Sequence, residues 1–152
     1  MNAGSVLREK EGQALVESAL TLLLFFVFLM AIFEGGRLLQ TQQTLTQAAR
    51  EGARYAVLPL TQTSTLPDCT RVRDVVRTYL QASWIDVPAS AIHVTRNYQY
   101  AGDPTVYSYI KVEYTFRWMV LSVFGAPDVN LSGDSAMRNE TSPSLAGLPP
   151  NC

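Results

Sequence analysis

The 152-residue sequence has few charged side chains and only one histidine. Charged residues make up 16% of it, and its 12 basic and 13 acidic residues form no long block of one sign. Nucleic-acid binding needs a clustered basic face, so we expect no nucleic-acid partner. The single histidine, His93, falls on the polar side of a predicted strand, where a solvent-facing side chain is the expected reading over a general base or a metal ligand.

The sequence also lacks the spacings that mark reactive cysteines and serines. Its two cysteines, Cys69 and Cys152, are far apart, so there is no C-x-x-C pattern for a metal or a redox pair. Ser18 lies in an apolar stretch without the context of a nucleophile elbow. We therefore predict that the protein is not an enzyme and that it has no metal site, cofactor or small-molecule substrate.

What the sequence does have is a long apolar run near its N-terminus. Residues 18–33 (SALTLLLFFVFLMAIF) carry no charge. The stretch 13–33 would span about 31 Å as a helix, which matches a hydrocarbon core of roughly 30 Å. A cleaved secretory signal would need a small-x-small site after the run, and EGGR follows instead. One membrane span is the prediction, and an uncleaved signal anchor stays open.

A glycine and a carboxylate precede this run at a suggestive spacing. Glu17 stands at its N-terminal edge, and Gly12 lies five residues earlier, at the end of a short polar head. A carboxylate near a helix centre in lipid costs roughly 2.5–3.5 kcal/mol, so by default it needs a partner. In a simple anchor, Glu17 would only reach into the headgroups. Together these features resemble the head of a type IV pilin-like precursor, and this resemblance implies a peptidase cut between Gly12 and Gln13 and assembly through Glu17.

The helical pattern continues beyond the apolar run. No proline interrupts it before Pro59, so one helix should run from Gln13 to about Val57, with a soft point at Gly35-Gly36 where it would bend or melt. Small residues in its outer half allow other backbones to approach closely, although packing on the protein's own domain explains them too. The residues predicted to pack are Leu38, Leu45, Ala49, Gly52 and Ala56.

The rest of the sequence predicts a short helix and a small antiparallel sheet. Val72, Val75, Val76, Tyr79 and Leu80 recur at helical spacing, with Asp68 or Thr70 as the N-cap. The period then changes to two over three candidate strands, which begin near residues 92, 106 and 129, with a turn at 100–104. The apolar stripe of the middle strand should be buried on the outer half of the long helix, at Leu45 to Ala56; it consists of Ile110, Val112, Tyr114, Phe116 and Trp118.

These elements give an α+β fold class with four segments, and their arrangement resembles that of a pilin. Residues 1–12 form a leader, 13–57 the long helix, 58–140 a small exported domain, and 141–152 an irregular tail rich in Pro, Ser and Gly. Disulfides persist in exported segments, so we expect Cys69 and Cys152 to bond to each other and hold the tail. Free or intermolecular thiols are the alternative.

The N-terminal segment resembles a known family. GQALVESALTLLLFF followed by EGGRLLQTQQTLTQAAREGARYA is similar to the TadE-like minor pilins or pseudopilins of tight-adherence (Tad, type IVc) systems. The similarity covers Gly12 and Glu17, the exit Glu34-Gly35-Gly36-Arg37, and the block AAREGARY at 48–55. Ser18 follows the carboxylate where Tad major pilins usually place an aromatic residue, which argues against the major-pilin subgroup.

This resemblance implies a function and a set of partners. A family member would be cut by a prepilin peptidase at the inner membrane and would assemble with other pilin-like subunits through its hydrophobic helix. It would reside in the bacterial inner membrane as a precursor, with its C-terminal domain exported, and extracellularly once in a filament. A minor or priming component of a Tad pilus is the expected role. The alternative is an uncleaved single-pass envelope protein whose exported domain binds a partner without polymerising.

Overall fold

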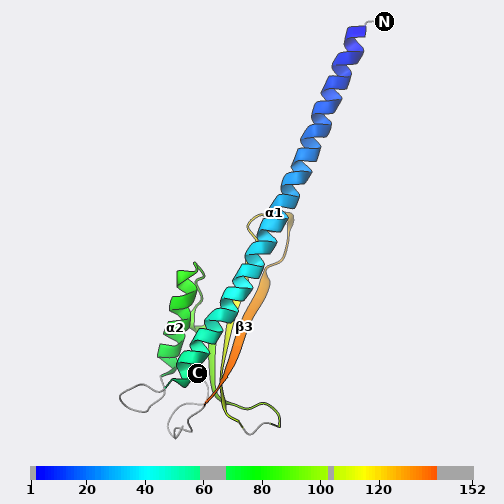
Figure 1. The fold of residues 1–152 in the computed structure, drawn as a ribbon. Helices are drawn as coiled ribbons and strands as arrows, with labels where there is room; N and C mark the ends of the chain where they lie inside the picture. Colours follow the sequence, from blue (N-terminus) through cyan, green and yellow to red (C-terminus); the bar gives the residue numbers. More distant parts are fainter. Residues whose placement is uncertain (1–2, 59–67, 103–104, 140–152) are drawn as a thin grey trace.

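The computed structural model describes residues 3–58, 68–102 and 105–139. Its dominant element is helix α1 (Ala3–Val57), whose 55 residues span about 82 Å. Figure 1 shows its N-terminal half as a straight rod that projects from a small head. The predicted start at Gln13 was too late, since the helix already begins at Ala3, and the expected irregular tail lies outside the described residues.

The soft point expected at Gly35-Gly36 is not realised, because α1 stays helical through both glycines. Two neighbouring positions explain why the helix holds. Glu34 just before the pair and Arg37 just after it both contact the head, through hydrogen bonds and a ring contact. Tertiary contacts on both sides of the pair therefore outweigh the low helix propensity of glycine, about 1 kcal/mol each relative to alanine.

Three antiparallel strands form the sheet, in the order β1-β2-β3. These are β1 (Ile92–Tyr98), β2 (Tyr107–Phe116) and β3 (Val129–Arg138). β2 and β3 pair in continuous register from Tyr107↔Arg138 to Phe116↔Val129, whereas the β1–β2 register shifts between Thr95 and Tyr98. The predicted α+β class, with a long helix, a short helix and a small antiparallel sheet, is confirmed.

Helix α2 (Cys69–Ala82) is the short helix, and Asp68 caps it. Its carboxylate accepts from the Cys69 N–H at 2.8 Å and from the Thr70 hydroxyl at 2.7 Å, and these bonds lower the pKa of Asp68. Thr70, the alternative N-cap predicted from the sequence, is therefore a hydrogen-bond donor to the actual N-cap, Asp68. Of the predicted apolar positions, Val75 is half-buried and Tyr79 is exposed, whereas three are fully buried: Val72, Val76 and Leu80.

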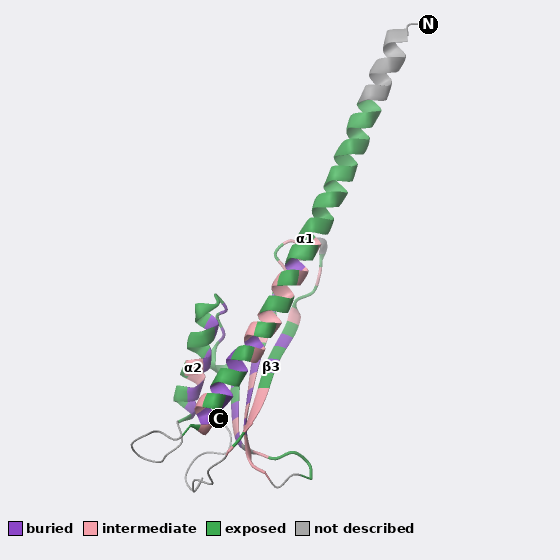
Figure 2. Cartoon of the chain, viewed as in Figure 1, coloured by how far each residue is buried: buried purple, intermediate pink, exposed green. Residues whose placement is uncertain are grey.

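The core lies where the C-terminal half of α1 crosses one face of the sheet beside α2 (Figure 2). At Gly133 the backbones of sheet and helix approach so closely that only glycine fits, because a Cβ there would clash with the Leu45 carbonyl group. A Cβ on Gly52 would clash with a side-chain methyl of Val76. The fully buried members of this core include Leu45, Ala48, Ala49, Ala53 and Ala56 of α1, with Ile92, Ile110 and Val112 of the sheet.

The predicted apolar stripe on β2 is mostly buried. Its C-terminal end, at Phe116, contacts α1 outside the predicted region Leu45 to Ala56. Ile110, Val112 and Phe116 are buried, and Tyr114 and Trp118 pack at the edge of the core. The guanidinium of Arg37 lies 5.3 Å from the centroid of the Phe116 ring. The contact region on α1 therefore extends N-terminally of Leu45 as far as Arg37, because β2 runs alongside this part of the helix.

The core face of β1 contains a charged residue that alternation alone did not predict. Arg96 is 1% exposed, on the same face as Ile92 and Val94. Burial lowers the pKa of its guanidinium, and the nearby carboxylate of Asp68 opposes that shift. Arg96 therefore interrupts the apolar face of β1 after Val94.

Candidate functional site

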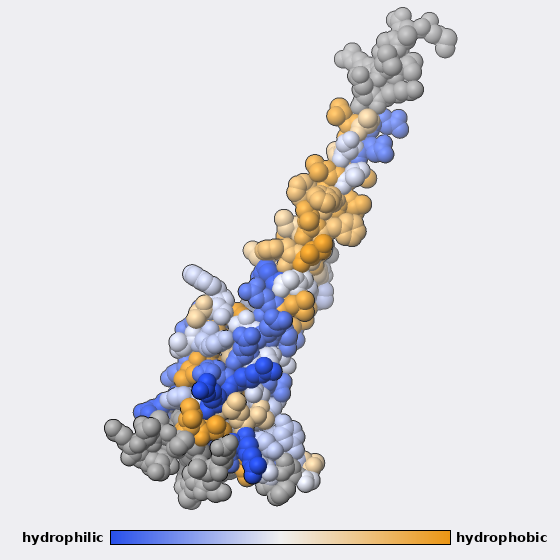
Figure 3. All heavy atoms as spheres, in the orientation of Figure 1, coloured by the Kyte–Doolittle hydropathy of each residue, from blue (hydrophilic) through white to orange (hydrophobic). Residues whose placement is uncertain are grey.

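The N-terminal half of α1 is apolar and bare. Of the described helices, only α1 is long and apolar enough to cross a membrane, and none of its most apolar stretch is buried inside the molecule. Figure 3 shows this stretch as a continuous hydrophobic surface between the polar head and the N-terminal end. An exposed apolar surface this large needs an environment outside the chain, either lipid or other apolar helices. Its members include Leu20, Leu23, Phe25, Phe28, Ile32 and Phe33.

Gly12, Gln13 and Glu17 are exposed on this half of the helix, far from the head. No described residue forms an ion pair with the Glu17 side chain; only its backbone carbonyl is engaged, by the Thr21 hydroxyl at 2.9 Å. A Cβ on Gly12 would meet nothing within 4 Å. Nothing in the described part of the chain therefore calls for a glycine at position 12 or supplies a partner for Glu17.

The residues predicted for helix packing all face the protein's own head. Leu45, Ala49 and Ala56 are completely buried, and Leu38 packs at the edge of the core. Gly52 lies against Val76 and Ile110. Of the two readings left open, the structure places this face in intramolecular packing, and the other faces of the outer half carry exposed polar residues such as Gln43, Gln47 and Arg50.

The most distinctive polar site in the head was not identified from the sequence. Glu34, the first residue after the apolar run, is 1% exposed. Its carboxylate accepts hydrogen bonds from three successive backbone N–H groups: Met119 at 2.5 Å, Val120 at 2.6 Å and Leu121 at 3.2 Å. Successive backbone N–H groups of this kind form an anion-binding nest. Here a side chain of the same protein fills that nest.

The electrostatics of this contact favour the ionised carboxylate. Burial alone would raise the pKa of Glu34, but the N–H groups of Val120, Leu121 and Met119, with the positive charge of Arg37, lower it overall. A signal for this site was present in the sequence. An acidic residue at the edge of an apolar run needs a partner, and Glu34 stands at the C-terminal edge of the run just as Glu17 stands at its N-terminal edge.

The loop that Glu34 holds is closed at its base by two further contacts. The Trp118 indole N–H donates to the Pro127 carbonyl at 2.8 Å, and Arg117 pairs with Asp128 at 3.6 Å. Within the loop, a short 3-10 helix η2 (Leu121–Phe124) ends at a Gly125 with φ 82°. The loop is therefore a defined structure fixed to α1 where the bare half of the helix begins.

A second unusual feature is Trp84, at the C-terminal end of α2. It has φ 60° and is 97% exposed. Its N–H donates to the Gln81 carbonyl, and the Ile85 N–H donates to the Leu80 carbonyl, both at 3.0 Å, which is a Schellman motif with Trp84 at the position that favours glycine. An exposed tryptophan there does not serve the stability of the head.

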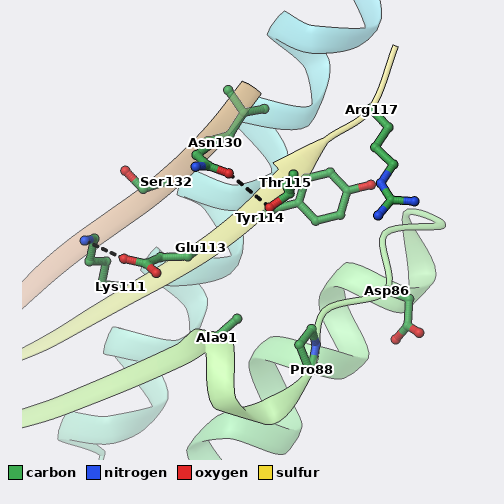
Figure 4. A pocket seen from close by; sticks show the side chains of 11 residues that line it. Asp86, Pro88, Ala91, Lys111, Glu113, Tyr114, Thr115, Arg117, Asn130 and Ser132 are labelled. Carbon is green, nitrogen blue, oxygen red and sulfur yellow. Dashed lines mark hydrogen bonds and ion pairs between the residues drawn. The ribbon is translucent and has the colours of Figure 1, made fainter. Parts of the chain in front are cut away.

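A hollow in the described part of the head lies against the polar face of the sheet, with a volume of about 640 Å³ (Figure 4). The Lys111 ammonium lies 2.7 Å from the Glu113 carboxylate, which raises the pKa of Lys111 and lowers that of Glu113. His93 is exposed at 3.8 Å from the same carboxylate. No group of three metal-ligating side chains occurs among the described residues. The charges are thus already paired in an open, solvated hollow.

The predicted Cys69–Cys152 bond stays a prediction. Cys69 is 4% exposed at the start of α2, and Cys152 lies outside the described residues. Non-reducing peptide mapping would test it, and a Cys69–Cys152 crosslinked peptide is the expected product.

Residues 12–54 match the family model described as TadE-like protein. This confirms, for that segment, the resemblance found in the sequence. The TadE-like segment contains Gly12, Glu17, Glu34 and Arg37, and it ends before α2 and the sheet. No curated protein and no solved structure matches the chain. The TadE-like segment thus covers α1 alone.

Proposed function

We propose that this protein is a pilin-like structural subunit of a Tad (type IVc) pilus or a related filament, as a minor or priming component. The observation that carries the proposal is the bare apolar half of α1, which the described part of the head does not cover and whose Glu17 side chain pairs with no described residue. The TadE-like match over residues 12–54 supports the same role. In this role the protein has no catalytic activity, and its partners are the inner membrane and other pilin-like subunits.

Processing is the second part of the proposal. A prepilin peptidase cuts between Gly12 and Gln13, and the new α-amine, with a reference pKa near 7.7–8.0, is largely cationic at neutral pH. That amine pairs with Glu17 of a neighbouring subunit within the apolar bundle. Such a pair offsets the desolvation of the carboxylate and fixes the axial register between subunits.

The alternative function is an uncleaved single-pass envelope protein whose head binds a partner without polymerising. One observation favours it: α1 is already helical across the Gly12–Gln13 bond. A bond inside a helix is not presented as an extended peptide, so a peptidase must first unwind the helix locally.

N-terminal sequencing of the protein recovered from cells separates the two functions. We expect the mature chain to begin at Gln13, and we expect Gly12→Leu to stay uncut. Because a Cβ at position 12 meets nothing in the structure, Gly12→Ala is the matched control that keeps a small side chain and the same fold. A mature protein that still begins at Met1 would favour the anchor.

Assembly is tested by crosslinking between subunits in membranes. Glu17→Gln should insert normally, since it removes a charge from the span, but it should reduce the crosslinking yield between subunits. Thr21→Val, one turn further along the same exposed helix, is the control and should crosslink normally. Unchanged crosslinking in Glu17→Gln would remove the support for an assembly carboxylate.

A further inference from the structure

The loop between Arg117 and Asp128 carries an apolar surface that the head does not cover. Its sequence, WMVLSVFGAP, contains no charged residue. Met119 is 67% exposed and Val123 is 81% exposed. In a head whose other apolar residues are largely packed into one core, two large apolar side chains are thus turned outward on a single short loop.

The position of this loop is fixed by Glu34. The carboxylate that accepts from the N–H groups of Met119, Val120 and Leu121 follows directly after Phe33, the last residue of the bare apolar helix. Phe33 itself is 61% exposed. Figure 1 shows the loop beside α1, at the end of the head from which the bare rod emerges. The exposed apolar surfaces of the helix and the loop therefore lie at the same level along α1.

The backbone of the loop is suited to a medium of low polarity. Glu34 accepts three of its N–H groups, and three more are bonded inside the loop: Val123 to Val120 at 3.0 Å, Gly125 to Ser122 at 3.0 Å, and Ala126 to Leu121 at 3.1 Å. Backbone groups without partners are costly where water is scarce. A loop with these internal hydrogen bonds can therefore move out of water at a small cost in free energy.

We propose that the loop 118–127 is a second membrane contact of this protein, in which Met119 and Val123 enter the headgroup–acyl boundary of the bilayer that α1 crosses. Lipid is the occupant because the loop continues the apolar surface of the spanning helix at the level where that surface ends. The flanking Arg117–Asp128 pair stays on the aqueous side. The contact fixes the height and rotation of the head on the bilayer, as interfacial side chains do for spanning helices. It requires that α1 spans the membrane, but not that the protein polymerises.

The chain carries its own reporters for a test. Its four methionines are Met1, Met30, Met119 and Met137. Met30 lies in the bare apolar helix, Met119 in the loop, and Met137 near the end of β3 that is far from the loop. The full-length protein is labelled with ¹³C at the methionine methyls and placed in lipid nanodiscs at one copy per disc. Single Met→Leu variants assign the signals.

Two paramagnetic reagents then locate each methyl. A lipid with a nitroxide at a shallow acyl position should broaden Met30 and Met119 several-fold more than Met137. A water-soluble gadolinium chelate should broaden Met119 less than its exposure in the structure implies. If Met119 instead behaves like Met137 toward the lipid nitroxide and is broadened by the chelate, the loop lies in water and the proposal is overturned. If Met30 is not broadened either, the span itself is wrong.

A substitution in the loop provides the second arm. Val123→Glu should reduce the broadening of Met119 by the lipid nitroxide several-fold, while an unchanged Met137 shift reports an intact head. Leu58→Glu, at a 50% exposed residue that directly follows the C-terminal end of α1, should leave Met119 unchanged. Equal broadening of Met119 in Val123→Glu and in the unsubstituted protein overturns the proposal. A further outcome also overturns it: Met119 is protected from both reagents, but only in discs with two copies of the protein. In that case a second copy, and not lipid, covers the loop.

Discussion

The two halves of α1 are built from one continuous helix but have opposite relations to the rest of the protein. The half at 13–33 contacts no part of the described head, and its large apolar side chains are exposed. The half at 34–57 is packed against β2, β3 and α2, and its small residues are buried. The difference shows that helical continuity alone does not assign a function to a surface. The protein's own head buries one face of the second half, whereas the large apolar side chains of the first half stay exposed.

Substituting one phenylalanine in each region should give the largest contrast. Phe116→Asp places an unpaired charge at a side chain that is 2% exposed, so we expect the head to unfold. Phe26→Ala removes a ring that is 51% exposed on the bare helix, so it should leave the urea midpoint of the head unchanged. Urea titration of the full chain in micelles, followed by near-ultraviolet circular dichroism, measures both. A folded Phe116→Asp would mean that the core is misassigned.

Substituting glycines tests the same contrast at the level of the backbone. Gly133→Ala puts a methyl group against the Leu45 carbonyl, which cannot move away like a side chain, so the head should lose about 1–3 kcal/mol of stability. Gly36→Ala meets nothing within 4 Å and should instead favour the helix by about 1 kcal/mol. Chemical denaturation of both variants checks the signs. Equal effects would show that α1 and the sheet are not in close contact at Gly133.

The boundary between the two halves should depend on Glu34. In Glu34→Gln, amide hydrogen exchange at Met119, Val120 and Leu121 should accelerate by a factor on the order of ten, because a charged acceptor is lost. Glu113→Gln, which alters an exposed carboxylate on the sheet, should leave these amides unchanged.

The same contact should respond to pH with a defined sign. The folded pKa of Glu34 is below its ordinary value of 4.5, so the unfolded state binds more protons between the two values. The stabilisation is therefore complete above about pH 4.5 and is lost as the pH falls through the folded pKa. Exchange protection of the loop should decrease on acidification, and Glu34→Gln should abolish this dependence. A loop that stays equally protected at low pH would contradict the assignment of an ionised Glu34.

The smallest expected effect is a gain. Trp84 occupies a left-handed position that favours glycine, and its side chain is almost fully exposed, so Trp84→Gly should stabilise the head by roughly 0.5–1 kcal/mol. Tyr79→Ala, on the surface of the same helix, should not stabilise it, because it removes a hydrogen bond to Gln47. Thermal unfolding of the two variants is the measurement. A destabilised Trp84→Gly would show that the indole packs in the folded head.

The elements that could be predicted from the sequence are those with a local period. The helical spacing of Val72, Val76 and Leu80 and the alternation from Ile110 to Phe116 both identified a buried face correctly. Arg96 is an exception to the apolar–polar alternation of β1, because sequence patterns assign arginine to the exposed face of a strand whereas this one is buried. Gly133 lacks a side chain that could continue the apolar alternation of β3, but the structure shows that the backbone of α1 approaches the sheet closely there.

The sequence by itself determined the bare apolar helix and the α+β class, because run length and period are properties of neighbouring residues. Only the tertiary structure decided which face of α1 belongs to the head and where Glu34 binds. The Glu34 contacts join residues 85 to 87 positions apart, and their donors are backbone N–H groups, which leave no trace in the identity of side chains. The tertiary structure therefore had to be known before the loop 118–127 could be placed beside the end of the bare apolar helix.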